Sequence, residues 1–368
     1  MTRPRAAAIG RDPAAEIRAY LVVLEVSMRL AAVTAILALV LGGCHATGDA
    51  DDPLIAQYSL SWGPVTVQPG QEATQCIWLR LGNDTEISVH QLHNVLSTSS
   101  HHLIVYKDDM DATEQTTPVP CQPFTGALNP TGRIFPVMIT QKHDDELTLP
   151  HHVAYTLAAH QMIKIEMHYL NPTDAAAEAS ATVDFSAADP EAIRDEANIL
   201  FIGTPDIVLQ PNMMTEVHEY FDPGRASLDL TGARFFAITG HTHRLGLSVE
   251  VGTAAGNPAA AVDPAGAVTQ VYAPDPFVWS EPVTTMHQPE FTLPAGGGFD
   301  FACRWYNSTS AVVRFGESAN DEMCFFWAYY YPSHGSHVCA HATFRGIGVD
   351  LCCPEAGATL CDLITSKF

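Results

Sequence analysis

Residues 321–332 read Asp-Glu-Met-Cys-Phe-Phe-Trp-Ala-Tyr-Tyr-Tyr-Pro, and this stretch decides the fold class. An apolar and aromatic run begins at Cys324 and ends at Tyr330, between two acidic residues and a proline. A short apolar run bounded in this way is typical of a buried β-strand, because a helix needs a longer segment with a different period.

Comparable short runs recur along the whole chain, and several of them alternate between apolar and polar residues. Helical periodicity is nearly absent, and residues 189–197 form either one short helix or a charged connector. We therefore predict an all-β chain of antiparallel sandwiches. The other runs occupy residues 76–81, 103–106, 163–169, 235–238 and 247–251.

The length and composition set the broad class. A chain of 368 residues with 47% hydrophobic and 16% charged residues suggests two folded domains and excludes bulk disorder. We expect an N-terminal domain over 54–204 and a C-terminal domain over 205–368. The 18 Lys and Arg against 41 Asp and Glu give a net charge of −23, which argues against a nucleic-acid partner.

Residues 1–44 have the features of an export signal. Arg29 precedes an apolar run over 30–40 that is shorter than the roughly 20 residues of a membrane-spanning helix. The run ends in Leu-Gly-Gly-Cys at 41–44, which resembles the lipobox of bacterial lipoproteins. We expect cleavage before Cys44, acylation of Cys44, an acidic linker over 45–53, and a protein anchored by lipid at the outer membrane or cell surface of a bacterium. The alternative is an ordinary cleaved signal, and the true start is either Met1 or Met28.

Three places combine histidines with predicted strands. His241 and His243 are two residues apart, so on a strand both imidazoles point to one face and can converge on a metal. His101 and His102 are consecutive and reach one metal only if the backbone is bulged there. His168 lies at the end of another run. The alternatives are a solvent-facing pair at 241 and 243, an incidental pair at 101 and 102, and a structural His168.

The order of these motifs resembles a known family. His-His at 101–102, MHYLNP at 167–172, HTHRLG at 241–246, DEMC at 321–324 and YYYP at 329–332 occur in the order found in the copper type II, ascorbate-dependent monooxygenases. That family includes dopamine beta-hydroxylase and peptidylglycine alpha-hydroxylating monooxygenase, and the resemblance covers most of residues 70–335. It implies two tandem jelly-roll-like β-sandwiches with one copper each, facing one another across an open, solvent-filled cleft.

The resemblance also implies the ligands of the two coppers. His101, His102 and His168 match the electron-donating copper, and His241, His243 and Met323 match the copper that binds oxygen. Imidazole binds both copper oxidation states, and the soft thioether of Met323 favours Cu(I). Taken alone, Met323 would be a core residue. The implied partners are O₂, a one-electron reductant such as ascorbate, and a small-molecule substrate.

The cysteine count fits an exported protein. Nine cysteines less Cys44 leave eight, an even number that predicts four disulfides in an oxidising compartment. By resemblance Cys324 pairs with Cys303; the alternative is that Cys324 is itself a copper ligand. Cys76 then pairs with Cys121, the other cysteine of the first half. The connectivity of the remaining four stays open among three possibilities: Cys339, Cys352, Cys353 and Cys361.

The substrate positions differ from those of the peptidylglycine enzyme. Thr239 stands where that enzyme has an arginine that helps to hold a carboxylate, and Phe325 and Trp327 replace its asparagine and tyrosine. This change favours an apolar or aromatic substrate, on which Trp327 could stack. The alternative is that both aromatic residues belong to the core.

The predicted function is hydroxylation of a C–H bond by a copper monooxygenase. One alternative is a non-catalytic copper-binding surface lipoprotein. Another is a zinc hydrolase built on His241 and His243, which is disfavoured because no acidic residue follows in HTHRLG. Seven further histidines match no ligand position and are expected at the surface or beside ligands, with the last three as candidates for an extra metal: His151, His152, His160, His287, His334, His337 and His341.

Overall fold

The computed structural model describes residues 52–110, 113–121, 133–258, 268–316, 318–357 and 361. Every named element in this part of the chain is a β-strand, which confirms the all-β class. The expected signal region 1–44, with Cys44, lies outside the described residues. No helix within them is long and apolar enough to cross a membrane.

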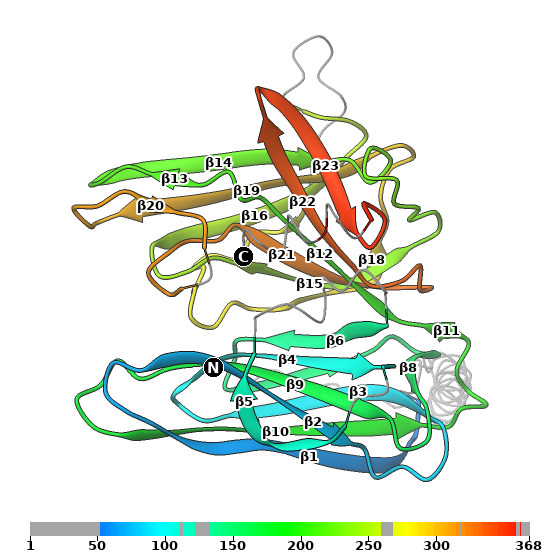
Figure 1. Cartoon of the computed structure of the whole chain (residues 1–368). Coiled ribbons are helices and arrows are strands. Elements are labelled where there is room, and N and C mark those ends of the chain that lie inside the picture. Colours follow the sequence, from blue (N-terminus) through cyan, green and yellow to red (C-terminus); the bar gives the residue numbers. More distant parts are fainter. Residues whose placement is uncertain are drawn as a thin grey trace, which may run out of the picture. The chain divides into compact units, whose positions relative to one another are not determined.

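The first eleven strands form two sheets packed as a sandwich (Figure 1). One sheet has the order β1-β10-β3-β8-β11, with β7 also paired to β3, and the other has the order β5-β2-β9-β4-β6. The strands are β1 (Leu54–Val67), β2 (Glu72–Arg80), β3 (Ile87–Leu96), β4 (Ser100–Asp108), β5 (Gln115–Pro120), β6 (Ile134–Thr140), β7 (Asp144–Thr148), β8 (Val153–Leu157), β9 (Met162–Leu170), β10 (Ala177–Ala188) and β11 (Asp195–Glu196).

The later strands form a second set of sheets, so the two tandem sandwiches are confirmed. Their orders are β18-β15-β21-β12-β22-β23, β14-β19-β16-β17 and β13-β20. The strands are β12 (Asn198–Gly203), β13 (Val208–Leu209), β14 (Met213–Phe221), β15 (Arg234–His241), β16 (Gly246–Ala254), β17 (Thr269–Tyr272), β18 (Thr285–Phe291), β19 (Gly298–Asn307), β20 (Val313–Arg314), β21 (Phe325–Tyr331), β22 (His337–Phe344) and β23 (Ile347–Cys353).

The chain passes from one sandwich to the other between Glu196 and Asn198. β11 pairs with β8, whereas β12 pairs with β21 and β22, so the change of sheets comes earlier than residues 204 and 205. Residues 189–197 contain turns and β11, and they are therefore a connector and not a helix.

β21 lies between two hydrophobic cores, and this position accounts for its apolar sequence. Phe326, Ala328 and Tyr330 belong to the core of the second sandwich. The alternate residues Phe325 and Trp327 belong to the other core, which also includes residues of the first sandwich. Because a strand points successive side chains to opposite faces, a strand between two cores must be apolar on both faces.

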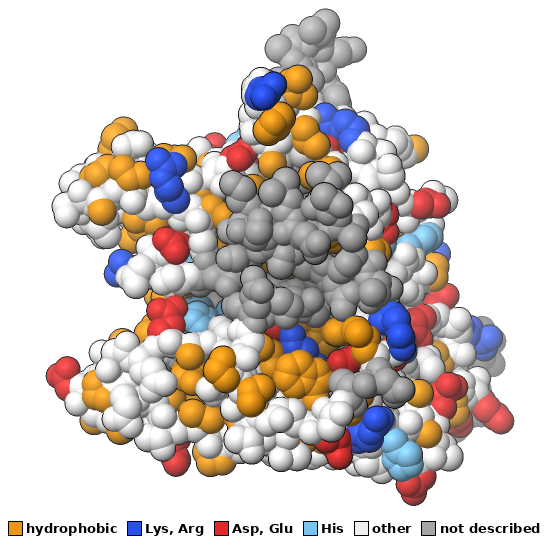
Figure 2. Space-filling model, in the orientation of Figure 1, with side chains coloured by type: hydrophobic (Ala, Val, Ile, Leu, Met, Phe, Trp, Pro, Cys, Tyr) orange, Lys and Arg blue, Asp and Glu red, His pale blue; other side chains and the backbone are white. Residues whose placement is uncertain are grey.

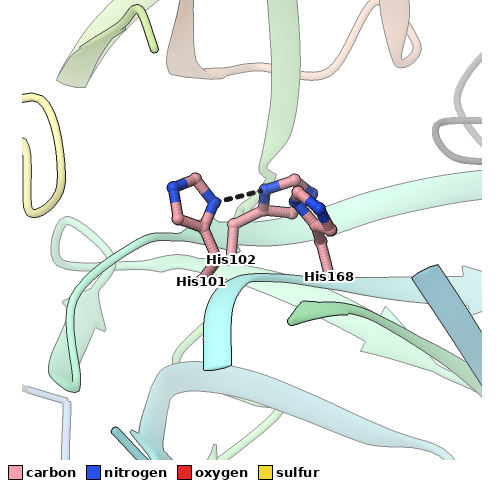
Figure 3. A group of neighbouring side chains, drawn as sticks. All are labelled: His101, His102 and His168. Atoms are coloured by element: carbon pink, nitrogen blue, oxygen red, sulfur yellow. Dashed lines mark hydrogen bonds between the residues drawn. The ribbon is translucent and has the colours of Figure 1, made fainter. Parts of the chain in front are cut away.

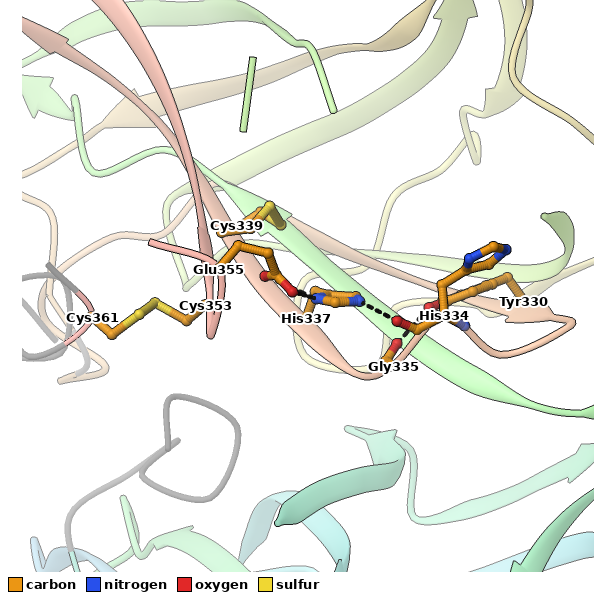
Figure 4. Close-up of a disulfide and its surroundings, with 9 residues drawn as sticks. Tyr330, His334, Gly335, His337, Cys339, Cys353, Glu355 and Cys361 are labelled. Carbon is orange, nitrogen blue, oxygen red and sulfur yellow. Dashed lines mark hydrogen bonds and ion pairs between the residues drawn. A yellow bond between two sulfur atoms is a disulfide. The ribbon is translucent and has the colours of Figure 1, made fainter. Parts of the chain in front are cut away.

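All four predicted disulfides are present. Cys76 bonds to Cys121 and Cys303 bonds to Cys324, which confirms both expected pairings and excludes Cys324 as a copper ligand. The tail pairs Cys339 with Cys352 and Cys353 with Cys361 (Figure 4).

The surface that Figure 2 shows carries acidic and basic side chains interspersed, without a continuous basic patch.

Candidate metal centre

The first histidine group lies where β4 meets β9. The register of these strands shifts between Ser100 and His102, so the bulge that the consecutive histidines require is present. His102 lies directly opposite His168. The imidazole centroids of His102 and His168 are 4.8 Å apart, and those of His101 and His168 are 5.2 Å apart (Figure 3).

The hydrogen bonds of this group define which nitrogens face one another. His168 donates Nε2–H to Glu72 Oε1 at 3.0 Å, which leaves Nδ1 as the nitrogen that can bind a metal. The Nδ1 atoms of His101 and His102 are 3.4 Å apart. One ligand atom from each of the three histidines lies within 4.8 Å of the other two, which is the spacing of a metal site with three imidazole ligands.

Burial keeps the imidazoles of His101 and His102 neutral. Desolvation lowers the pKa of His101 to about 3, with the neighbouring His168 adding to the shift. It also lowers the pKa of His102 well below the usual value. Neutral imidazoles offer lone pairs at neutral pH, so no proton has to be displaced before a metal binds.

The second histidine group follows β15. His241 is the last residue of this strand, and His243 lies beyond the strand end, so the expected same-face pair on one strand is only half correct. The two rings still converge, with centroids 5.2 Å apart. Glu322 holds the turn, because its carboxylate accepts the backbone N–H groups of His243 at 3.0 Å and Leu245 at 2.7 Å.

Hydrogen bonds also fix the tautomers of this second group. His241 donates Nδ1–H to Gln141 Oε1 at 2.7 Å, and His243 donates Nδ1–H to the Asp321 carbonyl at 3.1 Å. Both Nε2 atoms therefore carry the lone pairs. Partners of this kind orient metal-binding imidazoles. Burial lowers the pKa of His243 to about 4, so this ring is also neutral.

Met323 is buried, with 1% of its surface exposed, directly between Glu322 and Cys324. Its position is fixed from both sides. The side chain of Glu322 is tied to the His243 turn and to Trp305 Nε1 at 2.8 Å, and Cys324 is bonded to Cys303 in β19. The thioether segment and the HTH turn are therefore joined through a single buried carboxylate.

The two histidine groups share a pocket, and the expected open cleft between them stays a prediction. His102 of the first sandwich and His241 of the second line the same pocket, and both are at least nine-tenths buried. The contact between Gln141 and His241 brings the sandwiches together at this point. The complete lining is His102, Ile139, Gln141, Phe201, His241 and Trp327.

The three predicted substrate residues have different surroundings. Trp327 lines the pocket, with its ring centroid 6.2 Å from that of His241. Phe325 stacks on Phe201 at 4.9 Å and does not line the pocket. Thr239 is buried and its hydroxyl bonds to that of Thr284 at 2.9 Å. Only Trp327 is positioned to touch a molecule between the two groups.

Sequence reasoning missed the residues that hold the histidine rings. Gln141, Glu72 and Glu322 contact His241, His168 and the His243 turn from positions 100, 96 and 79 residues away. No local motif signals such partners; for Glu322, its place beside Met323 was the one available hint.

The histidines of the tail do not form a metal group. His337 bonds to Glu355 and to the His334 carbonyl (Figure 4). His341 lies between Asp350 and Glu219. Each of these two rings is occupied by its own carboxylate partner.

The fold and these groups define a β-sandwich protein with two neighbouring buried histidine groups. Residues 195–346 match the family model described as "Copper type II ascorbate-dependent monooxygenase, C-terminal domain". Residues 195–346 are thus a C-terminal domain of the copper type II ascorbate-dependent monooxygenase family. The matched residues include His241, His243 and Met323 and lie beyond His101, His102 and His168.

No curated protein matches the chain significantly. Among solved structures, the chain is similar to the major capsid protein P2 of bacteriophage PM2, with 10% identity and a TM-score of 0.34 over 76% of this chain and 100% of that chain. It is also similar to PNGase F, a glycosylasparaginase from Flavobacterium meningosepticum, with 8% identity and a TM-score of 0.28 over 75% and 95% of the two chains.

Proposed function

We propose that this protein hydroxylates a C–H bond of a small apolar or aromatic molecule, using O₂ and a one-electron reductant such as ascorbate. His101, His102 and His168 bind one copper ion, and His241, His243 and Met323 bind a second. The observation that supports this most is the pocket lined by both His102 and His241, because it brings the two ligand groups to one buried place.

The reaction balances with two external electrons. O₂ takes up four electrons and two protons as one oxygen atom enters the C–H bond and the other leaves as water. The C–H bond supplies two electrons and the reductant supplies the other two. When bound, copper supplies one-electron redox chemistry and the activation of O₂.

The residues of the chain have separate tasks in this proposal. Gln141 and the Asp321 carbonyl hold the rings of His241 and His243 with Nε2 toward the metal. Ile139, Phe201 and Trp327 give the pocket an apolar wall, which favours an apolar or aromatic substrate and excludes water from the reacting C–H bond.

Counting copper tests the proposal first. The purified protein should hold two copper ions per chain, falling to about one in His241→Ala. One copper or none in the wild type would contradict the binuclear site.

Met323→Ala separates the enzyme from a copper-binding protein. It should abolish ascorbate-driven O₂ consumption and leave the copper of the three-histidine group in place. The matched control is Met214→Ala, whose side chain is 58% exposed and should be neutral. If the wild type binds both coppers and still consumes no O₂ with any apolar substrate, the protein binds copper without catalysis.

We also propose that the protein is exported and anchored through a lipid on Cys44. Four disulfides among the described residues support an oxidising compartment. Growth with labelled palmitate should label the wild type and not Cys44→Ala. Equal labelling of both would overturn the lipid anchor.

A further inference from the structure

A third group of metal-ligating side chains lies on the other sheet of the first sandwich. Asp52, just before β1, meets His151 and His152 in the turn between β7 and β8. The predicted copper ligands of this sandwich, by contrast, lie on β4 and β9 of the sheet β5-β2-β9-β4-β6. This group therefore requires its own explanation.

The geometry suits one metal ion. Asp52 Oδ1 is 2.8 Å from His151 Nδ1 and 3.7 Å from His152 Nδ1. Two ligand atoms on a tetrahedral zinc are separated by about 3.3 Å, given bonds of about 2.0 Å, and the two observed distances lie on either side of this value. One ligand atom from each residue lies within 4.8 Å of the other two.

A plain ion pair does not account for the whole group. Asp52 and His151 alone would satisfy one another, yet His152 Nδ1 is a buried atom without a hydrogen-bond partner. A buried polar nitrogen without a partner is costly unless a ligand satisfies it. The carboxylate of Asp52 is 1% exposed and the two imidazoles are about one-third exposed, so an ion can enter from solvent.

The backbone is strained to bring both rings to the same side. Val153 N–H bonds to Pro150 O at 3.0 Å, which closes a turn with the two histidines in the middle. His152 has φ = 67°, a left-handed conformation that histidine adopts uncommonly. The backbone N–H of His152 also donates to Asp52 Oδ2 at 2.6 Å, which fixes the carboxylate against the turn. Strain of this kind persists where the surroundings require it, often at ligand sites.

We propose that Asp52, His151 and His152 form a third metal site, which binds one Zn²⁺ or Cu²⁺ ion through two imidazole nitrogens and one carboxylate oxygen. This ligand set suits both ions. The bound ion fastens the segment that precedes β1 to the turn before β8. The proposal does not depend on the copper sites, so it stands or falls separately from the proposed function.

Zinc stoichiometry of the metal-free protein tests the site. The double variant His151→Asn/His152→Asn should bind one Zn²⁺ per chain fewer than the wild type, and the zinc-induced rise in Tm should shrink accordingly. Asparagine tolerates the left-handed conformation at 152, so this variant keeps the turn. The control is His218→Asn, because His218 bonds to Asp300 at 2.8 Å as an ordinary exposed pair and should leave the zinc count unchanged.

Two further measurements make the outcome decisive. Asp52→Asn keeps an acceptor for the His152 N–H but loses the charge, and it should weaken zinc binding at this site by at least 10-fold while the folded far-UV spectrum is retained. Repeating the titration with Cu²⁺ identifies the preferred ion, and either preference supports the site. Equal counts of both ions in the wild type and the double variant would overturn the proposal and leave only a hydrogen-bonded His–Asp pair.

Discussion

Glu72 is a carboxylate outside the three-histidine group that orients one of its rings. Its Oε1 accepts the Nε2–H of His168 at 3.0 Å and the backbone N–H of Ala319 at 3.0 Å. The hydrogen bond from His168 lowers the pKa of Glu72 to about 2, so the carboxylate is charged at neutral pH. A carboxylate on the far nitrogen makes an imidazole a stronger ligand and fixes its orientation.

We therefore expect Glu72→Ala to weaken copper binding at the three-histidine group by about 10- to 100-fold. Glu72→Gln should have a smaller effect, since it keeps the acceptor and loses only the charge. Competition titration with a Cu(I) chelator measures both. Glu86→Ala, at an exposed glutamate, is the control. Unchanged affinity in Glu72→Ala would mean that His168 is oriented without this carboxylate.

The sequence predicts the candidate metal-binding residues but not the residues that orient them. The paired histidines, His168 and Met323 stand in short motifs, and motifs are local. Glu72 and Gln141 act on residues about a hundred positions away, and their contacts arise only when strands pair and the sandwiches meet. Polar contacts of this separation leave no periodic signal in one sequence.

Among the elements, β19 and the segment before β21 are joined by the Cys303–Cys324 bond. This disulfide closes a loop with a sequence separation of 21 and adjoins Met323. Closing a loop of this length stabilises a fold by about 3 kcal/mol. It also limits how far the thioether can move from the two histidines.

Replacing both cysteines, Cys303→Ala/Cys324→Ala, should lower the free energy of unfolding by about 3 kcal/mol. It should also release the copper of the His241 group first, because the Met323 segment loses its anchor. Denaturant unfolding and copper counting test the two effects. The control is Cys353→Ala/Cys361→Ala, which opens a bond with a sequence separation of 8. Equal copper loss in both double variants would contradict a role for the first disulfide in placing Met323.

A second element, the hairpin β22–β23, is tied to β14 by charge. His341 Nδ1 lies 2.7 Å from Asp350 Oδ1, and its Nε2 lies 3.2 Å from Glu219 Oε2. Burial alone lowers the pKa of His341, but the hydrogen bond and charge of Asp350, with Glu219, outweigh it and raise the pKa. Arg225, which pairs with Asp350, opposes the rise. Burial raises the pKa of Glu219.

The shifts of His341 and Glu219 contribute stability that is lost as the pH rises. A raised histidine pKa stabilises the folded state below pH 6.5 or so, and the gain is lost as the pH passes through the raised value. The raised pKa of Glu219 likewise stabilises the folded state below about pH 4.5, and this contribution is lost as the pH rises further. His341→Gln should therefore lower the free energy of unfolding by about 1.5 to 3 kcal/mol at pH 6, and by less at pH 9. Urea unfolding at several pH values measures this, with the exposed His218→Gln as control. An unchanged pH slope in His341→Gln would refute the assignment.

The elements themselves were largely predictable, and their partners were not. The six apolar runs expected between residues 76 and 330 lie in strands, except for the end residues Leu81 and Cys324, because alternation and turn residues are local signals. The parallel pairing of β12 with β22 could not be read from the sequence. This pairing joins strands that lie far apart in the sequence of the second sandwich. Because β12 pairs there, the chain enters the second sandwich at Asn198.

For the molecule as a whole, the important feature is the core that both sandwiches share. Trp327 and Phe201 of the second sandwich are in one hydrophobic cluster with Val137 and Ile139 of the first. Residues 51–368 accordingly form one compact unit. The pocket between the histidine groups lies at this junction, so the stability of the junction and the geometry of the site are coupled.

We expect both sandwiches to unfold in one cooperative transition, although chains of two domains often show two. Tyr329→Phe tests the coupling, because the Tyr329 hydroxyl accepts the backbone N–H of Ile139 at 3.0 Å. Loss of this buried bond should cost about 1 to 3 kcal/mol and lower the Tm while the transition stays single. Tyr306→Phe, at a side chain 44% exposed, should leave the Tm unchanged. Calorimetry that resolved two transitions, with only one of them moved by Tyr329→Phe, would mean that the sandwiches are energetically independent. Contacts between the sandwiches would then not be what holds the two histidine groups together.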